Sequence, residues 1–362
     1  MLGKGVAALR AGRFIGSKIV ARAVAGAIAG TVAGALALAA SAQAQTYKAE
    51  YKLSTIVGAP LVQGVAAEKW ASLVRERTQG RINIRVYPNS TLVGGDQTRE
   101  FTALRQGVID LSIGAGISWS PQVKELNVFS LPFLVHSTAI ADAMVAGDVG
   151  QYIFERIRAL GVTPLAWGDS GFRIVANSKH PIRRPSDLKG LKIRVIGSPL
   201  FGDFYSHMGA NPTQMSTADM QPALATQAVD GADQSVEGFV ALKLPSLKQK
   251  HLTLLNHTWE PYILSVNTGV WESWSPADRA IVQEAAVVVG KDIVAAKRKG
   301  LTAEDDSLIR EIGALGVEVV VPTAAEIKAF QEDSRPIYEK WAKQLPADLV
   351  AKAERTAAGV GP

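Results

Sequence analysis

The sequence predicts an α/β fold, and three observations support this prediction. Stretches with the two-residue period of strands alternate with stretches of helical period along most of the chain. Of the 362 residues, 47% are hydrophobic and 20% are charged, which suits a packed core and excludes a mainly disordered chain. The absence of cysteine excludes disulfides, thiolate metal sites, a catalytic thiol and a lipid-modified N-terminal cysteine.

The N-terminal half contains five predicted elements. Leu61, Val65, Trp70 and Val74 follow helical spacing, and Gly80 stands where a glycine commonly ends a helix. Alternating polar and apolar residues mark the strands on either side of this helix. In order, the predicted elements are a strand over 47–54, a helix over 61–77, a strand over 81–87, a helix over 97–106 and a strand over 109–113.

The C-terminal half continues the alternation. Ser275 and Pro276 open a long helix as cap and first-turn residue, and Thr323 with Glu326 forms a capping box before another helix. The other predicted elements are a strand over 191–196, a helix over 200–208, a helix over 218–226 and a strand over 229–234, followed by the long helix over 275–298. No flexible linker follows residue 46, so chain crossovers must join any separate lobes.

The N-terminus has the three parts of a cleaved export signal. Five cationic residues precede residue 23, an uncharged stretch covers 23–44, and Ala42-Gln43-Ala44 matches the small-x-small cleavage pattern. We expect cleavage after Ala44, which leaves 318 of the 362 residues. An N-terminal membrane anchor is the alternative, although the many Ala and Gly residues of this stretch disfavour insertion.

The net charge also depends on this segment. The full chain carries +6, whereas without the five cations it has 34 basic and 33 acidic residues and a net charge of +1. No later window combines a basic run with aromatic residues, so we expect no nucleic-acid partner. No later apolar run is long enough to span a membrane either, so the mature chain should be exported without membrane insertion.

Motifs of common enzymes and metal sites are weak in this chain. Gly168-Asp169-Ser170-Gly171 copies the surroundings of a serine-protease nucleophile, but no histidine has a matching context, and a link between a strand and a turn explains it better. His251 and His257 are predicted to be structural hydrogen-bonding groups, because six-residue spacing does not share a helix face. Gly114-Ala115-Gly116 lacks the rest of a dinucleotide fingerprint. We therefore predict no catalytic residue, metal site or cofactor.

Two arginines in apolar strands are more informative. Arg194 lies inside Leu191–Ile196, and Arg173, in Gly171-Phe172-Arg173-Ile174-Val175, is predicted to begin an apolar strand. A guanidinium in such a place keeps its charge and needs an anion, which is either a carboxylate of the protein or a ligand. The residues alone leave these two alternatives open.

A series of short motifs in constant order over residues 48–290 resembles the solute-binding proteins of TRAP (tripartite ATP-independent periplasmic) transporters, a family of receptors for C4-dicarboxylates and other organic acids. Each motif alone is weak evidence, whereas the ordered run is specific. The motifs are Gly80-Arg81-Ile82 with Val86-Tyr87-Pro88, Gly94-Gly95-Asp96, Gly107-Val108-Ile109-Asp110, Phe129-Ser130-Leu131-Pro132-Phe133, Asp187 to Val195, Gly209-Ala210-Asn211-Pro212, Ala223-Leu224 with Val229-Asp230-Gly231, and Asn256-His257.

The resemblance implies a two-lobe periplasmic binding protein. Each lobe would be a mixed sheet flanked by helices, with several crossovers and a long helix spanning both lobes. We expect lobe I over 45–170 plus about 260–298 and lobe II over 171–259 plus about 299–362. A monomeric receptor of this kind would capture a small organic acid in the periplasm and deliver it to the membrane subunits of a TRAP importer.

The resemblance also implies binding residues. Arg194 matches the arginine that clamps the ligand carboxylate in the family, and Arg173 matches a second arginine. Gln234 and Gln97 stand at the family's polar contact positions, and Thr217 replaces its common aromatic residue. Trp119, in a predicted loop after a strand, and Phe172 are candidates for an apolar wall, as are Trp167, Phe201 and Phe239. The departures at Gln234, Gln97 and Thr217 leave the ligand open among aliphatic diacids, hydroxy or oxo acids and aromatic acids.

Two other functions are compatible with an exported α/β protein. An exported hydrolase-like enzyme would need a nucleophile with a matched base, which the sequence does not supply. A ligand-sensing receptor for a membrane signalling protein would share the binding site but not the importer. Genes for TRAP membrane subunits beside this one would favour the transport function over sensing.

Overall fold

The computed structural model describes residues 47–360, so the predicted signal peptide lies outside the described residues. Ten strands form one connected mixed sheet. The strands are β1 (Tyr51–Ser54), β2 (Ile84–Tyr87), β3 (Leu111–Ala115), β4 (Val162–Asn177), β5 (Lys192–Val195), β6 (Asn211–Gln214), β7 (Gly231–Ser235), β8 (His251–Thr253), β9 (Trp259–Asn267) and β10 (Glu318–Val320).

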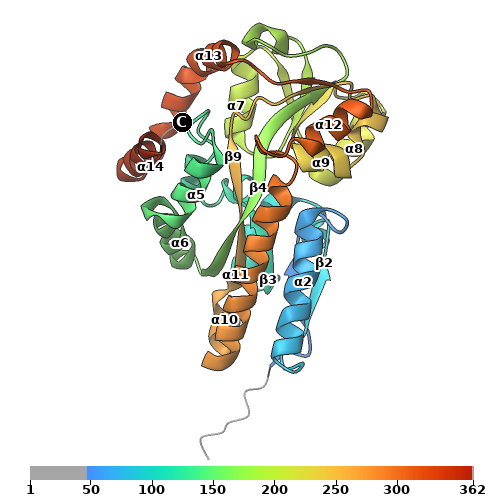
Figure 1. Cartoon of the computed structure of the whole chain (residues 1–362). Coiled ribbons are helices and arrows are strands. Elements are labelled where there is room, and N and C mark those ends of the chain that lie inside the picture. Colours follow the sequence, from blue (N-terminus) through green and yellow to red (C-terminus); the bar gives the residue numbers. More distant parts are fainter. Residues whose placement is uncertain (1–46, 361–362) are drawn as a thin grey trace, which may run out of the picture. The chain divides into compact units, whose positions relative to one another are not determined.

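Helices cover the sheet and link its strands (Figure 1). The α-helices are α2 (Val62–Arg77), α3 (Glu100–Arg105), α4 (Gly116–Trp119), α5 (Thr138–Ala146), α6 (Asp148–Ala159), α7 (Pro199–His207), α8 (Thr217–Ala225), α9 (Val236–Ala241), α10 (Thr268–Ser273), α11 (Pro276–Arg298), α12 (Ser307–Ala314), α13 (Ala324–Ala342) and α14 (Ala347–Gly359). The short 3₁₀ helices are η1 (Thr91–Val93), η2 (Gln97–Arg99), η3 (Lys124–Val128), η4 (Pro185–Leu188) and η5 (Leu244–Leu247).

Strand β4 joins two groups of strands. One group consists of β1, β2, β3 and β9, and the other of β5, β6, β7, β8 and β10. The first part of β4 pairs antiparallel with β9, and its last part pairs with β7 and β8. The sheet order is β2-β1-β3-β9-β4-β7-β5-β6, with β8 on β4 and β10 on β8. Both groups mix parallel and antiparallel pairs, so the predicted α/β class with mixed sheets is confirmed.

The register of β4 shifts between Asp169 and Gly171, where Gly171 has φ +94°. This conformation suits glycine, because it has no Cβ to clash with the backbone. The serine-protease-like motif therefore lies within a long strand, and the prediction of a link between a strand and a turn is wrong. Arg173 also lies inside β4, where it pairs with Ser235, and does not begin a strand as predicted.

The strongly periodic elements agree with prediction to within a few residues. The helices predicted over 61–77, 200–208, 218–226 and 275–298 are α2, α7, α8 and α11. Ser275 accepts a hydrogen bond from the Asp278 N–H at 3.1 Å, and Thr323 and Glu326 form the expected capping box. Two predicted strands start late, because residues 81 and 82 belong to the turn after α2 and residues 47–50 precede β1.

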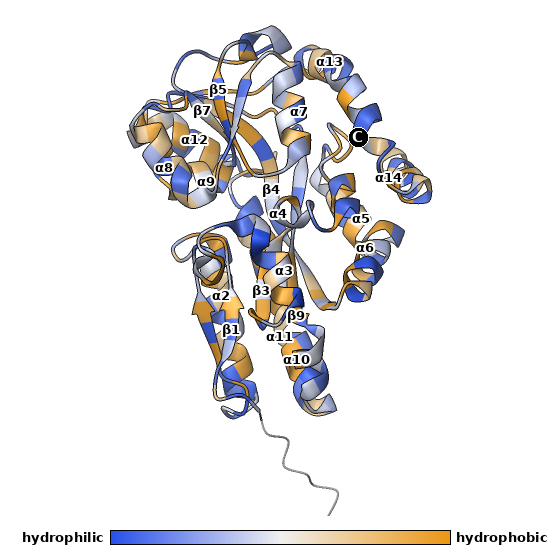
Figure 2. Ribbon diagram, turned by 180° about the vertical axis from the view of Figure 1, so that it is seen from behind, coloured by the Kyte–Doolittle hydropathy of each residue, from blue (hydrophilic) through white to orange (hydrophobic). Residues whose placement is uncertain are grey.

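Strands carry the most hydrophobic segments, while the covering helices show mixed hydropathy (Figure 2). The two C-terminal helices pack on other helices that cover the sheet. Helix α13 packs on α7, where Lys340 binds Asp203 at 2.7 Å, and α14 packs on α5 and α6. Among residues 47–360, no helix has both the length and the apolar character needed to cross a membrane.

Helix α11 packs directly on β4 at Gly290. A Cβ on Gly290 would lie 2.3 Å from the carbonyl oxygen of Trp167, so neither element can make room without shifting its backbone. We expect Gly290→Ala to lower the free energy of unfolding by about 1–3 kcal/mol, although alanine favours helices.

The matched control for this prediction is Gly313→Ala in α12, where an added Cβ meets no atom within 4 Å. That variant should be stabilised by about 0.5–1 kcal/mol through helix propensity alone. Urea unfolding of both variants tests the contrast, and equal changes would contradict the close packing at Gly290.

Candidate functional site

Arg194 is a buried cation inside the sheet. It lies in β5 between β6 and β7, and it is fully buried. Its nitrogens donate to the carbonyl oxygens of Met215 (3.2 Å) and Asp233 (3.4 Å) and to the Thr217 hydroxyl (3.3 Å). Burial, and then the nearby charge of Arg173, lowers its pKa to about 9, so it stays charged at neutral pH.

These partners are neutral groups. Within the described residues, Arg194 forms no ion pair with a carboxylate, unlike Arg173, Lys297 and Arg298. A buried cation without an anion is costly, because desolvation penalises the charge. The arrangement therefore favours the ligand over a protein carboxylate as the partner of Arg194.

Arg173 is balanced by Asp233, which lies on the neighbouring strand β7. The Arg173 Nε donates to Asp233 Oδ1 at 2.6 Å, its Nη2 donates to the Asp233 carbonyl at 2.8 Å, and Nη2 also pairs with Oδ1. Tyr205 donates to Oδ2 at 2.8 Å, and the Nε2 of His257 lies 3.1 Å from the same oxygen. Burial raises the pKa of Asp233, but the charge of Arg173 and the contacts of His257 and Tyr205 outweigh it and lower the pKa.

Gln97 and Thr217 connect two distant parts of the chain. Gln97 lies in η2, and its Oε1 accepts hydrogen bonds from the Thr217 N–H (3.2 Å) and hydroxyl (3.0 Å). Its Nε2 donates to the Ser118 hydroxyl at 2.8 Å. Because Thr217 also bonds Arg194, these side chains form a continuous polar chain from η2 through the start of α8 to β5.

A small cavity of about 40 Å³ lies next to this chain of side chains. This volume can hold water or a small ligand group. Its polar wall consists of Gln63, Gln97, Ser170, Arg173, Thr217, Gln234, Ser235, Glu237 and Lys297, and its apolar wall of Ile56, Val57, Leu61, Ala115, Ile117, Ile196, Leu242 and Tyr262. We take this cavity, with Arg194 behind Thr217, as the candidate ligand site.

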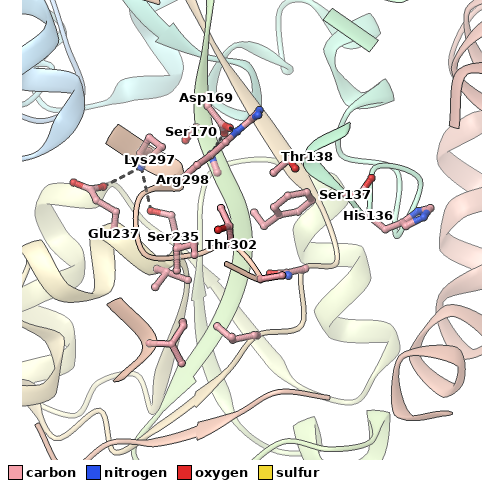
Figure 3. Close-up of a pocket in the computed structure, with 18 of the residues that line it drawn as sticks. His136, Ser137, Thr138, Asp169, Ser170, Ser235, Glu237, Lys297, Arg298 and Thr302 are labelled. Atoms are coloured by element: carbon pink, nitrogen blue, oxygen red, sulfur yellow. Dashed lines mark hydrogen bonds and ion pairs between the residues drawn. The ribbon is translucent and has the colours of Figure 1, made fainter. Parts of the chain in front are cut away.

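A larger cavity of about 520 Å³ adjoins it and is shown in Figure 3. Its two cations are already neutralised: Lys297 binds Glu237 at 2.9 Å, and Arg298 binds Asp142 and Asp169, each at 2.8 Å. The three carboxylates of its lining, Asp169, Glu237 and Glu304, outnumber these two cations and leave no excess positive charge for an anion there. The larger cavity is therefore a weaker candidate for an acid site than the smaller one.

The predicted site residues separate into two groups. Arg173, Gln97, Thr217 and Gln234 line the small cavity, and Arg194 contacts Thr217. The Gln234 Oε1 accepts from the Ser235 N–H at 2.9 Å, so this amide is oriented by its own strand.

None of the five predicted wall residues, Trp119, Phe172, Trp167, Phe201 and Phe239, lines the small cavity. Phe172 lines the larger cavity. Trp119 is fully buried in α4, with its ring 5.2 Å from that of Phe101 and against Gly114, where an added Cβ would lie 1.9 Å away. The prediction of a loop at Trp119 is wrong, and neither residue lines the small cavity.

Four residues of this region were not among the predicted site residues. Asp233 anchors Arg173, and the ring of His257 stacks on Phe204 at 4.7 Å between ring centres. Lys297 and Glu237 line the cavity as an ion pair. A lone carboxylate inside the otherwise uncharged strand Gly231–Ser235 is the one sequence signal that marks Asp233. No cluster of three or more His, Asp or Glu side chains in residues 47–360 is arranged to hold a metal ion.

Known proteins resemble this chain in sequence and in structure. A family model described as bacterial extracellular solute-binding protein, family 7, matches residues 53–344. The 2,3-diketo-L-gulonate-binding periplasmic protein of Escherichia coli is 30% identical over 291 residues, which are 80% of this chain and 86% of that protein.

Two solved structures extend the similarity to three dimensions. A TRAP periplasmic solute-binding protein from Ralstonia eutropha H16, solved with bound (S)-2-acetolactate, is 51% identical, has a TM-score of 0.86 and matches over 87% of this chain and 100% of that chain. A second, from Chromohalobacter salexigens with bound D-glucuronate, is 28% identical, has a TM-score of 0.78 and matches over 84% of this chain and 99% of that chain. These matches confirm the predicted periplasmic-binding-protein fold and the resemblance of the motifs.

Proposed function

This chain belongs to the bacterial extracellular solute-binding protein family 7, the periplasmic solute-binding proteins of TRAP transporters, and we propose that it captures a small organic acid through Arg194 and Arg173. One observation carries this proposal: Arg194 is a fully buried cation that no carboxylate of the described residues balances, beside a polar cavity. A carboxylate ligand supplies the missing charge and accepts directional hydrogen bonds from the guanidinium.

The cavity and the related proteins narrow the ligand class. The cavity is small, and amide and hydroxyl groups of Gln63, Gln97, Gln234 and Thr217 line it beside the arginines. Such groups suit a short acid with hydroxyl or oxo substituents, and (S)-2-acetolactate in the similar Ralstonia eutropha protein is an acid of this kind. Micromolar binding requires about 8 kcal/mol, which a charged clamp, two or three amide contacts and the excluded water supply together.

Closure of two lobes over the ligand is part of the proposal. We propose lobe I over 45–170 plus about 260–298 and lobe II over 171–259 plus about 299–362, which meet at β4. The Gln97–Thr217 hydrogen bonds join a residue of each lobe, as expected of a closed form. Closure removes water from the clamp and strengthens its electrostatic interactions.

The same proposal includes the receptor's partners and location. The mature chain would begin after Ala44, act as a monomer in the periplasm without a catalytic role, and deliver the acid to the membrane subunits of a TRAP importer. The enzyme alternative lacks support at the serine-protease-like motif, because within residues 47–360 no hydrogen bond joins the Ser170 hydroxyl to a histidine, and the Asp169 carboxylate binds Trp259 (2.8 Å) and Arg298 (2.8 Å). A signalling receptor would keep the same site, and the membrane partner distinguishes it from an importer subunit.

Ligand-dependent thermal shift of the purified protein tests the clamp. An acid at a hundred times its Kd adds about 2.7 kcal/mol of stability. We expect Arg194→Met to raise the Kd by at least ~100-fold, because it removes charge-assisted hydrogen bonds worth ~1.5–3 kcal/mol each. Without ligand, this variant should be at least as stable as the wild type, since it removes an unbalanced buried charge.

The matched control is Arg85→Met, which replaces an arginine of similar strand position but with a side chain 66% exposed. This control should bind the acid with unchanged affinity. An Arg194→Met variant that keeps the wild-type thermal shift would exclude the clamp.

A further inference from the structure

Most charged side chains around the small cavity form ion pairs with each other. Arg173 is paired with Asp233, and Lys297 is paired with Glu237. Arg194 remains without a carboxylate among the described residues. The charges of these five side chains therefore leave a single positive charge for the ligand to neutralise.

Two further carboxyl groups near the site, those of Glu260 and Asp219, leave this count unchanged at neutral pH. Burial raises the pKa of Glu260 to about 8, and its Oε1 accepts from the Ser130 hydroxyl at 2.5 Å, so it is mostly protonated. Asp219 is exposed, where water screens its charge.

The Glu237–Lys297 pair is held in place from two sides, as Figure 3 shows for Lys297. The Lys297 Nζ lies 2.9 Å from Glu237 Oε2 and 3.4 Å from the Ser235 hydroxyl, and its side chain is only 4% exposed. The other Glu237 oxygen accepts from the Val62 N–H at 3.2 Å, at the start of α2. Burial lowers the pKa of Lys297, but Tyr262 and Glu237 raise it above its ordinary value, so the ammonium is charged and already neutralised.

A second carboxylate in this cavity has no available cation. It would meet the negative charge of Glu237, and a buried charge without a partner is strongly unfavourable. Like-charge contact of this kind is an effective means of rejecting a wrong ligand.

We infer that the site selects monocarboxylates over dicarboxylates and that Glu237, by neutralising Lys297, is the residue that sets this selectivity. The inference rests on the proposed function, since it assigns the ligand class of the same site. It distinguishes this chain from a receptor for C4-dicarboxylates, and it places the selectivity on two residues that do not belong to the arginine clamp.

Isothermal titration calorimetry with matched acids tests the inference. One pair is (S)-2-acetolactate and 2-hydroxy-2-methylbutanedioate, and the other is 2-hydroxybutanoate and 2-hydroxybutanedioate. Within each pair the acids share the hydroxy-acid end and differ mainly in a second carboxylate. We expect the wild-type protein to bind at least one monocarboxylate ~100-fold more tightly than its dicarboxylate counterpart.

Three variants locate the selectivity. Glu237→Gln keeps an oxygen for the Val62 N–H but frees the charge of Lys297, so the ratio should move toward the dicarboxylate by at least ~10-fold. The double variant Glu237→Gln/Lys297→Gln restores a single positive charge and should restore the preference for the monocarboxylate. The matched control is Asp292→Asn, which removes a carboxylate that binds Lys69 on the exposed side of α11 and should leave the ratio unchanged.

The outcomes separate the inference from the proposed function. Equal binding of the two acids of a pair by the wild-type protein, or an unchanged ratio in Glu237→Gln, would overturn the inference and leave the receptor function standing. Binding of no acid at all would overturn both. If circular dichroism shows that Glu237→Gln is unfolded, the single variant Lys297→Gln tests the inference instead. This variant leaves no excess positive charge in the site, so it should weaken monocarboxylate binding by at least ~10-fold. Unchanged binding would overturn the inference.

Discussion

Replacing Asp233 by Asn is expected to lower the free energy of unfolding by about 3–5 kcal/mol, the usual cost of removing one partner of a buried ion pair. Asp233 is fully buried, and its carboxylate contacts the side chains of Arg173, Tyr205 and His257. The variant leaves Arg173 without a carboxylate, and the charge of Arg194 lies close to it. Two buried cations would then face each other in a low-dielectric environment.

Urea unfolding without ligand measures this effect, and two further variants identify its cause. Tyr205→Phe removes one hydrogen bond of the same carboxylate and should cost only about 1 kcal/mol. The double variant Arg173→Met/Asp233→Asn removes both charges and should recover much of the loss, because an ion pair replaced as a whole is far less costly than one broken. A loss of 1 kcal/mol or less in Asp233→Asn would show that the pair does not stabilise the fold.

The elements that could be predicted from the sequence are those with strong local periodicity. Helix α11 combines a serine cap, a proline in the first turn and a regular apolar face, and its predicted and observed ends nearly coincide. Strands β4 and β9 lack such a signal, because both faces of each are largely buried and their residues do not alternate. Their lengths and pairing follow from distant segments, which local patterns do not reveal.

The same distinction applies to the site. Arg194 could be found because a cation inside a short apolar strand is exceptional in the sequence itself. Lys297 and Glu237 could not, because they are ordinary charged residues at the end of one helix and the start of another. Only the fold brings them together across 60 residues of chain. The proposed clamp arginine could thus be predicted from the sequence, whereas the paired charges that we propose to limit the ligand could be recognised only in the structure.

A fall in stability between pH 5 and pH 8 is the second large effect we expect, and it comes from two buried glutamates. Burial raises the pKa of Glu260 from 4.5 to about 8 and that of Glu100 from 4.5 to about 7. At a pH between 4.5 and the raised pKa, each glutamate keeps its proton in the native state, whereas the unfolded chain has released it. Stability therefore falls as the pH rises, by up to about 1.4 kcal/mol per pH unit for each group.

The carboxylates with lowered pKa values do not cancel this trend. The carboxylates that bind protons more weakly in the native state than in the unfolded chain are Asp187, Asp233, Asp278, Asp305 and Glu326. Their contribution is complete above their unfolded pKa and is lost as the pH falls through the native one. Their titrations thus affect stability at about pH 4 and below, outside the window in which the two glutamates titrate.

Glu260→Gln provides the decisive comparison, because glutamine has nearly the shape of a protonated glutamate and does not titrate. Its free energy of unfolding, measured in urea at pH 5, 6, 7 and 8, should fall less steeply with pH than that of the wild type. The control Glu332→Gln removes a glutamate with a side chain 69% exposed and should leave the slope unchanged. Parallel curves for Glu260→Gln and the wild type would mean that Glu260 is already ionised in the folded protein, and the cavity would then hold no excess positive charge for a ligand.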